Sequence, residues 1–121
     1  MKKRVLTTGG AGFIGINSVR LFVKKKFEVI ILDNFSRSGT KQNIKNLFNE
    51  NLLYKKIRVI KLDLRNSEKL KTVIKKYKPN LILHLAGQVA VTTSLLNPKN
   101  DLEINILGTF NLLTEANKYF H

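Results

Sequence analysis

Short apolar runs alternate with amphipathic stretches along the chain. The runs are residues 5–8, 29–32, 57–62 and 81–85, and leucine or β-branched side chains fill most of each. Continuous apolar runs of this length are typical of strands buried on both faces of a parallel sheet. We therefore expect four buried strands, and Asp33 and Asp63 end the second and third of them.

Helices are predicted from apolar positions that recur every three or four residues. The first two span residues 12–25 and 42–49; a third is capped by Asn66 or Ser67 and stopped by Pro79, and a last one follows a loop around Pro98. The apolar positions that define the four helices are Ile16, Val19, Phe22 and Val23; Ile44, Leu47 and Phe48; Leu70, Val73, Ile74 and Tyr77; and Leu102, Ile106, Phe110 and Leu113.

Strands that alternate with helices predict the α/β class, with right-handed crossovers and a parallel sheet. We expect the first half of a doubly wound, Rossmann-type sheet with the spatial strand order 3-2-1-4. A complete fold of this kind has more strands. Residues 1–121 are therefore expected to form one incomplete domain, the N-terminal half only.

A glycine-rich turn follows the first predicted strand. Residues 8–15 read Thr-Gly-Gly-Ala-Gly-Phe-Ile-Gly, in which Gly10, Gly12 and Gly15 match G-x-G-x-x-G, and Gly9, Gly12 and Gly15 match G-x-x-G-x-x-G. Such glycines permit a tight turn, the approach of a pyrophosphate and close packing of helix on strand. The N–H groups at the helix start then face the phosphates. The position between a strand and a helix predicts a dinucleotide site.

Asp33 supplies the second part of that prediction. It lies 21 residues after Gly12, at the carboxyl end of the second strand. An acid there bonds the ribose hydroxyls and repels a 2′-phosphate, which favours NAD over NADP. Arg37 tempers this preference because an arginine just beyond can accept a 2′-phosphate. The alternative is that Asp33 merely begins a turn with Asn34.

Two further positions have competing interpretations. Asp63 and Leu64 follow the third strand, where they could contact the amino group and ring of an adenine, or simply form a strand-ending turn. His84 lies in an apolar strand, and we expect it to be a packed residue rather than a catalyst.

The net charge of the chain raises the question of nucleic-acid binding. Lys and Arg number 22 against 8 acids, a formal balance of +14. The lysines are scattered over helix ends and connections, where they favour the helix dipole, and no aromatic residues interleave with them. We expect no specific nucleic-acid binding, although a basic surface also attracts an anionic dinucleotide or nucleotide-sugar. A basic nucleic-acid-binding protein is the alternative.

Other composition features exclude several classes. The chain has no cysteine, so neither a disulfide framework nor a thiolate zinc site is expected, and no metal is assigned. No run approaches the roughly 18 apolar residues of a membrane span. The basic N-terminus is interrupted at once by Thr7 to Gly10, which excludes a signal peptide. We expect a cytoplasmic protein without membrane contact.

Five segments resemble, in order and spacing, the extended short-chain dehydrogenase/reductase family. They are residues 8–15, Asp33-Asn34, Asp63-Leu64, His84-Leu85-Ala86-Gly87 and Asn105-Ile106-Leu107-Gly108-Thr109. Residues 33–39 and 84–94, followed by Asn97-Pro98 and Glu103-Ile104-Asn105, are most similar to members that act on CDP-linked dideoxyhexoses. The stretch 88–94 discriminates best because it occupies the loop after the fourth strand.

This resemblance implies a role for each matching residue. Pyrophosphate contacts are implied for Gly9, Gly12, Phe13, Ile14 and Gly15. Adenosine contacts are implied for Asp33, Asn34, Ser36, Arg37, Asp63 and Leu64. Leu85, Ala86 and Gln88 would line the path to the nicotinamide, and Asn105 would brace that loop. Thr92, Thr93 and Ser94 would face the sugar nucleotide, although hydroxyls on a loop are also common turn formers.

The resemblance also implies an activity. The parent enzyme would be an NAD-dependent epimerase, a homo-oligomer when full length, that inverts C2 of a CDP-linked dideoxyhexose by transient oxidation. The family's catalytic Tyr-x-x-x-Lys pair and its substrate domain lie beyond residue 121, and none of Tyr54, Tyr77 and Tyr119 has Lys four residues later. No catalytic residue is therefore assigned, and we expect these residues alone to be inactive. The alternatives are a UDP-sugar 4-epimerase, a 4,6-dehydratase or a non-catalytic dinucleotide-binding module.

Overall fold

The computed structural model of the chain describes residues 2–50 and 54–120. Its four strands are β1 (Arg4–Thr8), β2 (Glu28–Asp33), β3 (Ile57–Lys61) and β4 (Leu81–His84). Neighbouring strands are parallel and their order is β3-β2-β1-β4. The parallel sheet and the strand order predicted from the sequence are both confirmed.

The chain divides into two compact units, Met1–Lys61 with Pro79–Leu85, and Leu62–Lys78 with Ala86–His121. The first unit contains the sheet, α1 (Phe13–Lys24), α2 (Thr40–Asn49) and the short 3-10 helix η1 (Tyr54–Lys56). The second unit contains α3 (Ser67–Tyr77), α4 (Val91–Leu96), α5 (Pro98–Leu102), the π-helical segment η2 (Glu103–Leu107) and α6 (Gly108–Asn117). Among the described residues, no helix is long and apolar enough to cross a membrane.

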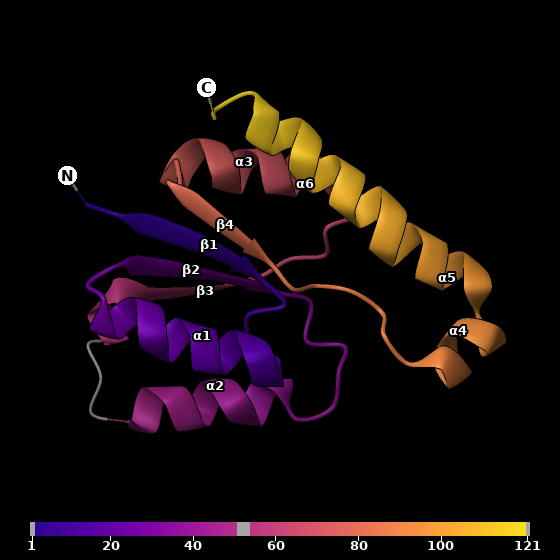
Figure 1. Cartoon of the computed structure of the whole chain (residues 1–121), viewed down its shortest axis with the longest axis horizontal. Coiled ribbons are helices and arrows are strands. Elements are labelled where there is room, and N and C mark those ends of the chain that lie inside the picture. Colours follow the sequence, from indigo (N-terminus) through magenta and orange to yellow (C-terminus); the bar gives the residue numbers. More distant parts are fainter. Residues whose placement is uncertain (1, 51–53, 121) are drawn as a thin grey trace. The chain divides into compact units, whose positions relative to one another are not determined.

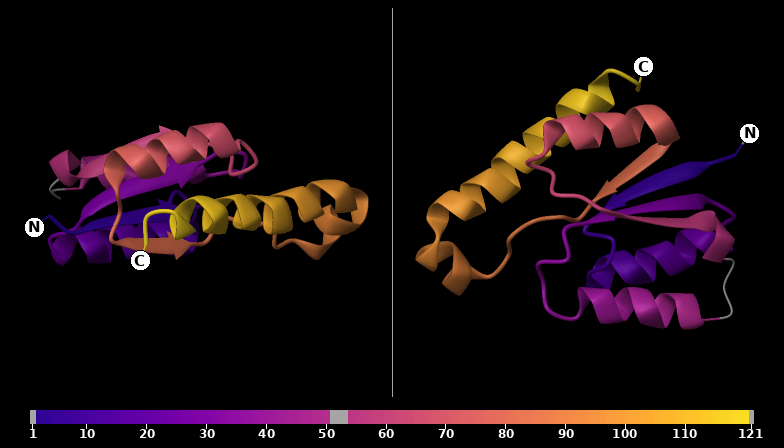
Figure 2. Two further views of the ribbon diagram at one scale, coloured as in Figure 1. Left: turned by 90° about the horizontal axis from the view of Figure 1, so that it is seen from above. Right: turned by 180° about the vertical axis from the view of Figure 1, so that it is seen from behind.

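The core of the first unit lies between the sheet and two helices. Figures 1 and 2 show α1 and α2 on the same side of the four strands. The buried core residues on this side are Val5, Ile16, Val19, Val23, Val29, Ile31, Leu47 and Ile57. Phe22, predicted to be buried, is only partly so, and its ring meets that of Phe27 edge to face. Most apolar positions predicted for α1 therefore do face the core.

One apolar position of α2 departs from the prediction. Leu47 and Thr40 are buried and mark the inward line of this helix, but Phe48 is 39% exposed. Successive helical residues are about 100° apart around the axis, so Phe48 lies at the border of the inward face that Leu47 occupies.

The expectation of four buried strands is wrong for the two outer strands, β3, in which Arg58 and Lys61 are exposed, and β4. β4 is hydrogen-bonded only to β1, so it forms an edge of the sheet. Leu81 is 41% exposed, and the other three residues of the strand are partly buried. The predicted order 3-2-1-4 already places both strands at the ends of the sheet, so the apolar runs alone overstate their burial.

In the second unit the third predicted helix is confirmed and its cap is settled. Asn66 is the N-cap, and its side chain accepts a hydrogen bond from the Lys69 N–H at 3.1 Å. The helix ends at Tyr77, before Lys78 turns into the left-handed region and Pro79 follows.

The last predicted helix is longer and less regular than expected. Figure 1 shows α5, η2 and α6 as one continuous rod, with α4 as a separate short helix before it. Leu102, Ile106, Phe110 and Leu113 line one face, as predicted, but each is more than half exposed. The covered side instead carries Gly108, Leu112 and Glu115. The side of the helix that carries Gly108 can lie close to Leu64, because this residue has no side chain; a Cβ there would lie 3.2 Å from the Leu64 Cβ.

Candidate functional site

Two glycines of the turn between β1 and α1 are required by packing. A Cβ at Gly15 would lie 2.4 Å from the Gly9 carbonyl oxygen and 2.6 Å from the Gly10 Cα. A Cβ at Gly10 would lie 2.4 Å from the Thr7 hydroxyl oxygen. Gly9 adopts a left-handed conformation (φ 66°), and its N–H donates to the Leu32 carbonyl at 2.8 Å. The turn therefore holds α1 tightly against β1 and β2.

Gly12 has a different environment. A Cβ there would meet only the Gly9 carbonyl oxygen, at an ordinary 3.4 Å. Gly12 is the N-cap of α1, whose first turn has neither a side-chain cap nor an acidic residue, and Phe13 and Ile14 are exposed. Backbone N–H groups in the first turn of a helix have no intrahelical partner and carry positive partial charge. This end of α1 can therefore accept an anion such as a pyrophosphate.

Asp33 lies at the end of β2 and is bonded to the glycine turn. Its Oδ2 accepts from the Ala11 N–H at 3.1 Å, and its Oδ1 accepts from the Phe35 N–H at 2.9 Å. The residue is only 9% exposed. Each carboxylate oxygen has a second lone pair, so both can still accept from ribose hydroxyls. Asp33 thus begins a turn and also lies beside the glycine-rich turn. Its two interpretations, as a turn former and as a ribose ligand, are therefore compatible with each other.

The loop after Asp33 is ordered by local hydrogen bonds. Asn34 Oδ1 accepts from the Ser36 N–H at 3.0 Å and from the Ser36 hydroxyl at 2.8 Å. Phe35 takes a left-handed conformation (φ 58°), and its N–H donates to Asp33. Arg37 is exposed, and its carbonyl accepts from the Thr40 hydroxyl at 2.8 Å.

Two residues that support the turn escaped prediction. The Asn43 amide of α2 donates to the Ala11 carbonyl at 2.9 Å. The Thr8 hydroxyl oxygen accepts from the Leu85 N–H at 3.1 Å and is hydrogen-bonded to His84 Nδ1. Asn43 gives no sequence signal, since amides are common on exposed helix faces, whereas Thr8 lies within the glycine motif itself.

His84 is half-buried and joins β4 to β1 through Thr8. Burial lowers the pKa of its imidazole below the ordinary value. A neutral ring can accept a hydrogen bond from the Thr8 hydroxyl on Nδ1, which is consistent with a packed residue that links β4 to β1.

In the second unit, Asp63 is held by the arginine that follows it. Arg65 Nη2 lies 2.7 Å from Asp63 Oδ2, Arg65 Nε donates to Oδ1 at 3.0 Å, and Nη1 bonds Asn100 and Glu103. The hydrogen bonds that Arg65 donates to Asp63 are the main cause that raises the pKa of the Arg65 guanidinium. Leu64 is 8% exposed, so its side chain is buried. An adenine contact through Asp63 stays a prediction, and it would share that carboxylate with Arg65.

The loop after β4 is held by Asn105. Asn105 Oδ1 accepts from the Gln88 N–H at 2.7 Å, and Asn105 Nδ2 donates to the Gln88 carbonyl at 3.0 Å. Ala86 is partly buried and precedes this contact. Both backbone groups of Gln88 are therefore fixed by one side chain in η2. Their relation to a nicotinamide stays a prediction.

The three hydroxyl residues implied for the substrate do not share one environment. They lie in α4, where a loop was expected. This short helix has no capping side chain, so the sequence carries no signal for its start. Thr92 and Thr93 are exposed. Ser94 is partly buried, and its hydroxyl lies 2.8 Å from Asp101 Oδ1 and 3.1 Å from the Ala90 carbonyl oxygen. Asp101 was not predicted as a site residue.

The expected residues therefore gather in separate groups. Within the first unit, the glycine turn, Asp33 and the loop 34–37 are joined by hydrogen bonds, and Leu85 is bonded to Thr8 just before that turn. Within the second unit, Gln88, Ser94 and Asn105 are linked through Asp101.

Comparison with known proteins identifies the family of this chain. The profile of the family described as GDP-mannose 4,6 dehydratase matches residues 6–120. The CDP-paratose 2-epimerase of Salmonella typhi is 39% identical over 116 residues, which are 96% of this chain and 33% of that protein. The dTDP-glucose 4,6-dehydratase of Salmonella typhimurium is 30% identical over 97% of this chain and 32% of its own length.

A solved epimerase structure has the same fold over almost all of this chain. The UDP-glucose 4-epimerase of Thermus thermophilus, in complex with NAD, superposes with a TM-score of 0.81 and 34% identity, over 96% of this chain and 34% of that protein. The chain thus spans about a third of the length of the relatives it matches. With a profile match over nearly its whole length, the chain belongs to the GDP-mannose 4,6 dehydratase family, among the extended short-chain dehydrogenases/reductases that include sugar-nucleotide epimerases and dehydratases.

Proposed function

We propose that this chain is the NAD-binding part of a nucleotide-sugar epimerase. The observation that carries the proposal is the bond between Asp33 Oδ2 and the Ala11 N–H, which joins a ribose-binding carboxylate to an uncapped helix start. The glycine turn fits the cofactor, since a Cβ at Gly12 would meet nothing closer than 3.4 Å and its outer side is open to a phosphate. NAD, when bound, accepts a hydride from the sugar and returns it.

Each group of the first unit would have one role toward the cofactor. The N–H groups that follow Gly12 would bind the pyrophosphate with the positive end of the α1 dipole. Asp33 would accept from the adenosine ribose hydroxyls, and the ordered loop from Asn34 to Arg37 would border the ribose. The carboxylate charge opposes a 2′-phosphate, so we expect NAD to bind more tightly than NADP.

The test is calorimetric titration of the chain with both cofactors. The Asp33→Asn variant keeps the shape and one carbonyl acceptor but loses the charge, so the preference for NAD over NADP should shrink. Asn34→Ala, next in the same loop, leaves that charge in place and should keep the preference. Tighter binding of NADP by the unmodified chain would overturn the assignment of Asp33.

For the substrate we propose a CDP-linked dideoxyhexose epimerised at C2. The support is the segment from Gln88 to Ser94 together with the similarity to CDP-paratose 2-epimerase. A protein that joins residues 1–121 to the C-terminal part of that relative should turn over CDP-paratose and leave UDP-galactose unchanged, as judged by NMR of the products. Turnover of UDP-galactose alone would instead assign the chain to the 4-epimerases.

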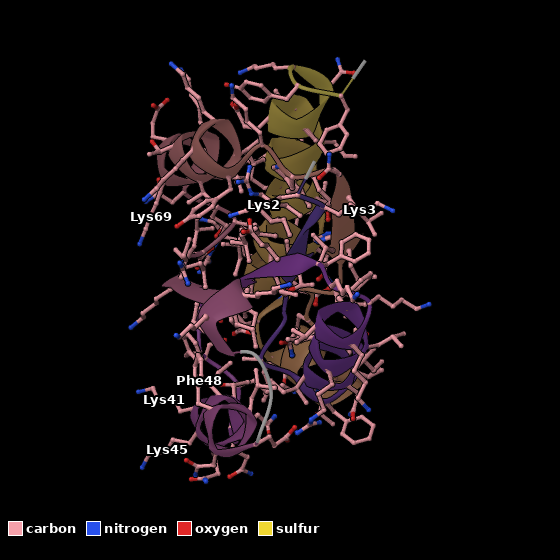
Figure 3. The ribbon with its side chains drawn as sticks, turned by 90° about the vertical axis from the view of Figure 1, so that its left-hand side faces the viewer. Lys2, Lys3, Lys41, Lys45, Phe48 and Lys69 are labelled. Carbon is pink, nitrogen blue, oxygen red and sulfur yellow. The ribbon has the colours of Figure 1, made fainter. Side chains whose placement is uncertain are left out.

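Two other functions have weaker support. A UDP-sugar 4-epimerase or a 4,6-dehydratase is consistent with the other relatives, since both activities are named among proteins at 30–36% identity. Nucleic-acid binding is favoured only by the charge. Figure 3 shows Lys41 and Lys45 of α2 extending outward separately, and both are exposed. Scattered cations of this kind give weak attraction that falls steeply with salt.

A further inference from the structure

Ala11, in the glycine-rich turn, is hydrogen-bonded to a side chain through each of its backbone groups. Its N–H donates to Asp33 Oδ2 at 3.1 Å, and its carbonyl oxygen accepts from Asn43 Nδ2 at 2.9 Å. Ala11 is completely buried, so both groups are shielded from water. A buried backbone group without a partner is costly, and both side chains therefore contribute to holding Ala11 in place.

The same two bonds lie at the two ends of loop 34–39. Asp33 is the last residue of β2, directly before the loop, and Asn43 lies near the start of α2, whose N-cap is Gly39. Both ends of the loop are thus attached to one buried residue, Ala11, within the first unit. A loop that is closed at both ends has few conformations, so its backbone is held at a defined distance from the Asp33 carboxylate.

Arg37 is the charged residue of this loop, and its backbone is tied to α2. The Arg37 carbonyl oxygen accepts from the Thr40 hydroxyl at 2.8 Å and from the Thr40 N–H at 3.4 Å. Thr40 is buried and is the first residue of α2, the helix that Asn43 attaches to the turn. An arginine just beyond the ribose-binding acid can accept a 2′-phosphate when it reaches that group. Here the Arg37 backbone is held in place relative to Asp33, whose charge opposes the same phosphate.

We propose that Asn43 is a positioning residue for the adenosine ribose and a determinant of the preference for NAD over NADP. This inference rests on the proposed NAD function. Asn43 holds the start of α2 to Ala11, so loop 34–39 stays close to Asp33 and accepts a ribose hydroxyl in preference to a phosphate. Without this bond the loop opens, and Arg37 can move to a 2′-phosphate.

The first experiment is calorimetric titration of the unmodified chain and of Asn43→Ala with NAD and NADP. Alanine is the best helix former, so this variant removes the bond to Ala11 without weakening α2 itself. NAD binding should weaken about tenfold and NADP binding by less than about threefold, so the preference for NAD shrinks although Asp33 keeps its charge. Losses by the same factor for both cofactors, as a merely destabilised turn would give, or no loss at all, would overturn the proposal.

Asn46→Ala is the matched control. Asn46 is also an asparagine of α2, but it is exposed, and its side chain accepts from the Gln42 amide of the same helix at 2.8 Å. The preference for NAD should be unchanged in this variant. A preference that shrinks as much as in Asn43→Ala would show that any change in α2 has this effect, which contradicts a specific role of Asn43.

The second experiment needs no ligand and follows the bond itself. In the ligand-free chain, Asn43→Ala should speed hydrogen exchange of the Ala11 amide. Asn43→Asp should do the same, because a carboxylate cannot donate to the Ala11 carbonyl, while an acid near the start of a helix does not weaken the helix. The Lys25 amide, bonded to the Leu21 carbonyl at 3.0 Å at the other end of α1, should exchange unchanged.

Hydrogen exchange also separates this inference from the proposed function. If the unmodified chain binds neither cofactor, the proposed function fails, while faster exchange at Ala11 still supports the attachment by Asn43. Unchanged exchange at Ala11 in both variants refutes that attachment in either case.

Discussion

The Asp33 carboxylate has two functions, one in the stability of the turn and one in the proposed binding of the ribose. Its oxygens accept from the Ala11 and Phe35 N–H groups, and they would also accept from the ribose. In the same loop Phe35 adopts a left-handed backbone, which costs a non-glycine residue roughly 1–2 kcal/mol. Fold and site therefore depend on the same side chain, so a change at Asp33 affects stability as well as affinity.

We expect Asp33→Ala to lower the free energy of unfolding by about 1–3 kcal/mol for each buried N–H that loses its acceptor. Asn34→Ala is the comparison, because the bonds of Asn34 to Ser36 are exposed to solvent and should cost less than about 1 kcal/mol. Urea unfolding of the three proteins measures both values. Equal losses would mean that water replaces the carboxylate at Asp33.

His84 predicts a dependence of stability on pH. Burial lowers the pKa of the folded imidazole, so the unfolded chain binds the proton first as the pH falls below about 6.5. The stabilisation is complete above that pH and is lost on acidification toward the folded pKa. Because the ring is only half-buried, the loss should be below about 1 kcal/mol.

The measurement for His84 is the free energy of unfolding at about pH 8 and about pH 5.5, for the unmodified chain and for His84→Gln. The unmodified chain should lose more stability between the two values. Glu28, whose pKa is lowered chiefly by its hydrogen bond from Arg4, titrates below this range in both proteins. An identical loss in both proteins would contradict the role of His84.

At the scale of elements, different glycines of the turn into α1 serve packing and cofactor binding. Gly15→Ala places a Cβ 2.4 Å from a backbone carbonyl oxygen and should prevent the native fold. Gly12→Ala meets only an ordinary contact and keeps an allowed conformation (φ −74°, ψ 177°), so it should remain folded. Its methyl group would nonetheless occupy the approach of the pyrophosphate, and NAD affinity should fall.

Circular dichroism and calorimetry together test this pair of glycines. A folded Gly15→Ala chain, or a Gly12→Ala chain with unchanged NAD affinity, would show that the two glycines have been assigned the wrong roles.

The same elements show what a sequence can and cannot predict. Parallel strands and the helix α1 follow from periodicity and the glycine turn, which are local signals, and the strand order follows from the doubly wound fold that these signals indicate. An apolar run does not specify the neighbours of a strand, but the predicted strand order does, and it places β3 and β4 at the ends of the sheet. The helix α4 and the π turn at Asn105 also lack local signals, and Asp101 is recognised only once its oxygen is seen beside Ser94 and Asn105.

At the scale of the whole molecule, exposed apolar side chains occur at several places in the described part of the chain, and two of these places bear on association. One is the outer edge of β4 in the first unit, where Leu81 is exposed. The other is the face of the α5–η2–α6 rod in the second unit that carries Ile106 and Phe110. Unpaired strand edges beside apolar side chains promote association between chains.

We expect the 121-residue chain to associate in solution through the edge of β4, because backbone groups there can pair with another strand. Leu81→Lys introduces a charge of the kind that natural edges use against such pairing, and it should shift the protein toward the monomer. Leu21→Lys is the matched control, because Leu21 is also exposed but lies on α1. Light scattering at several concentrations measures the mass of each variant. If Leu81→Lys has no effect and Ile106→Lys releases the monomer, the contact lies on the helical rod instead, and the edge strand is protected by its own twist or short length.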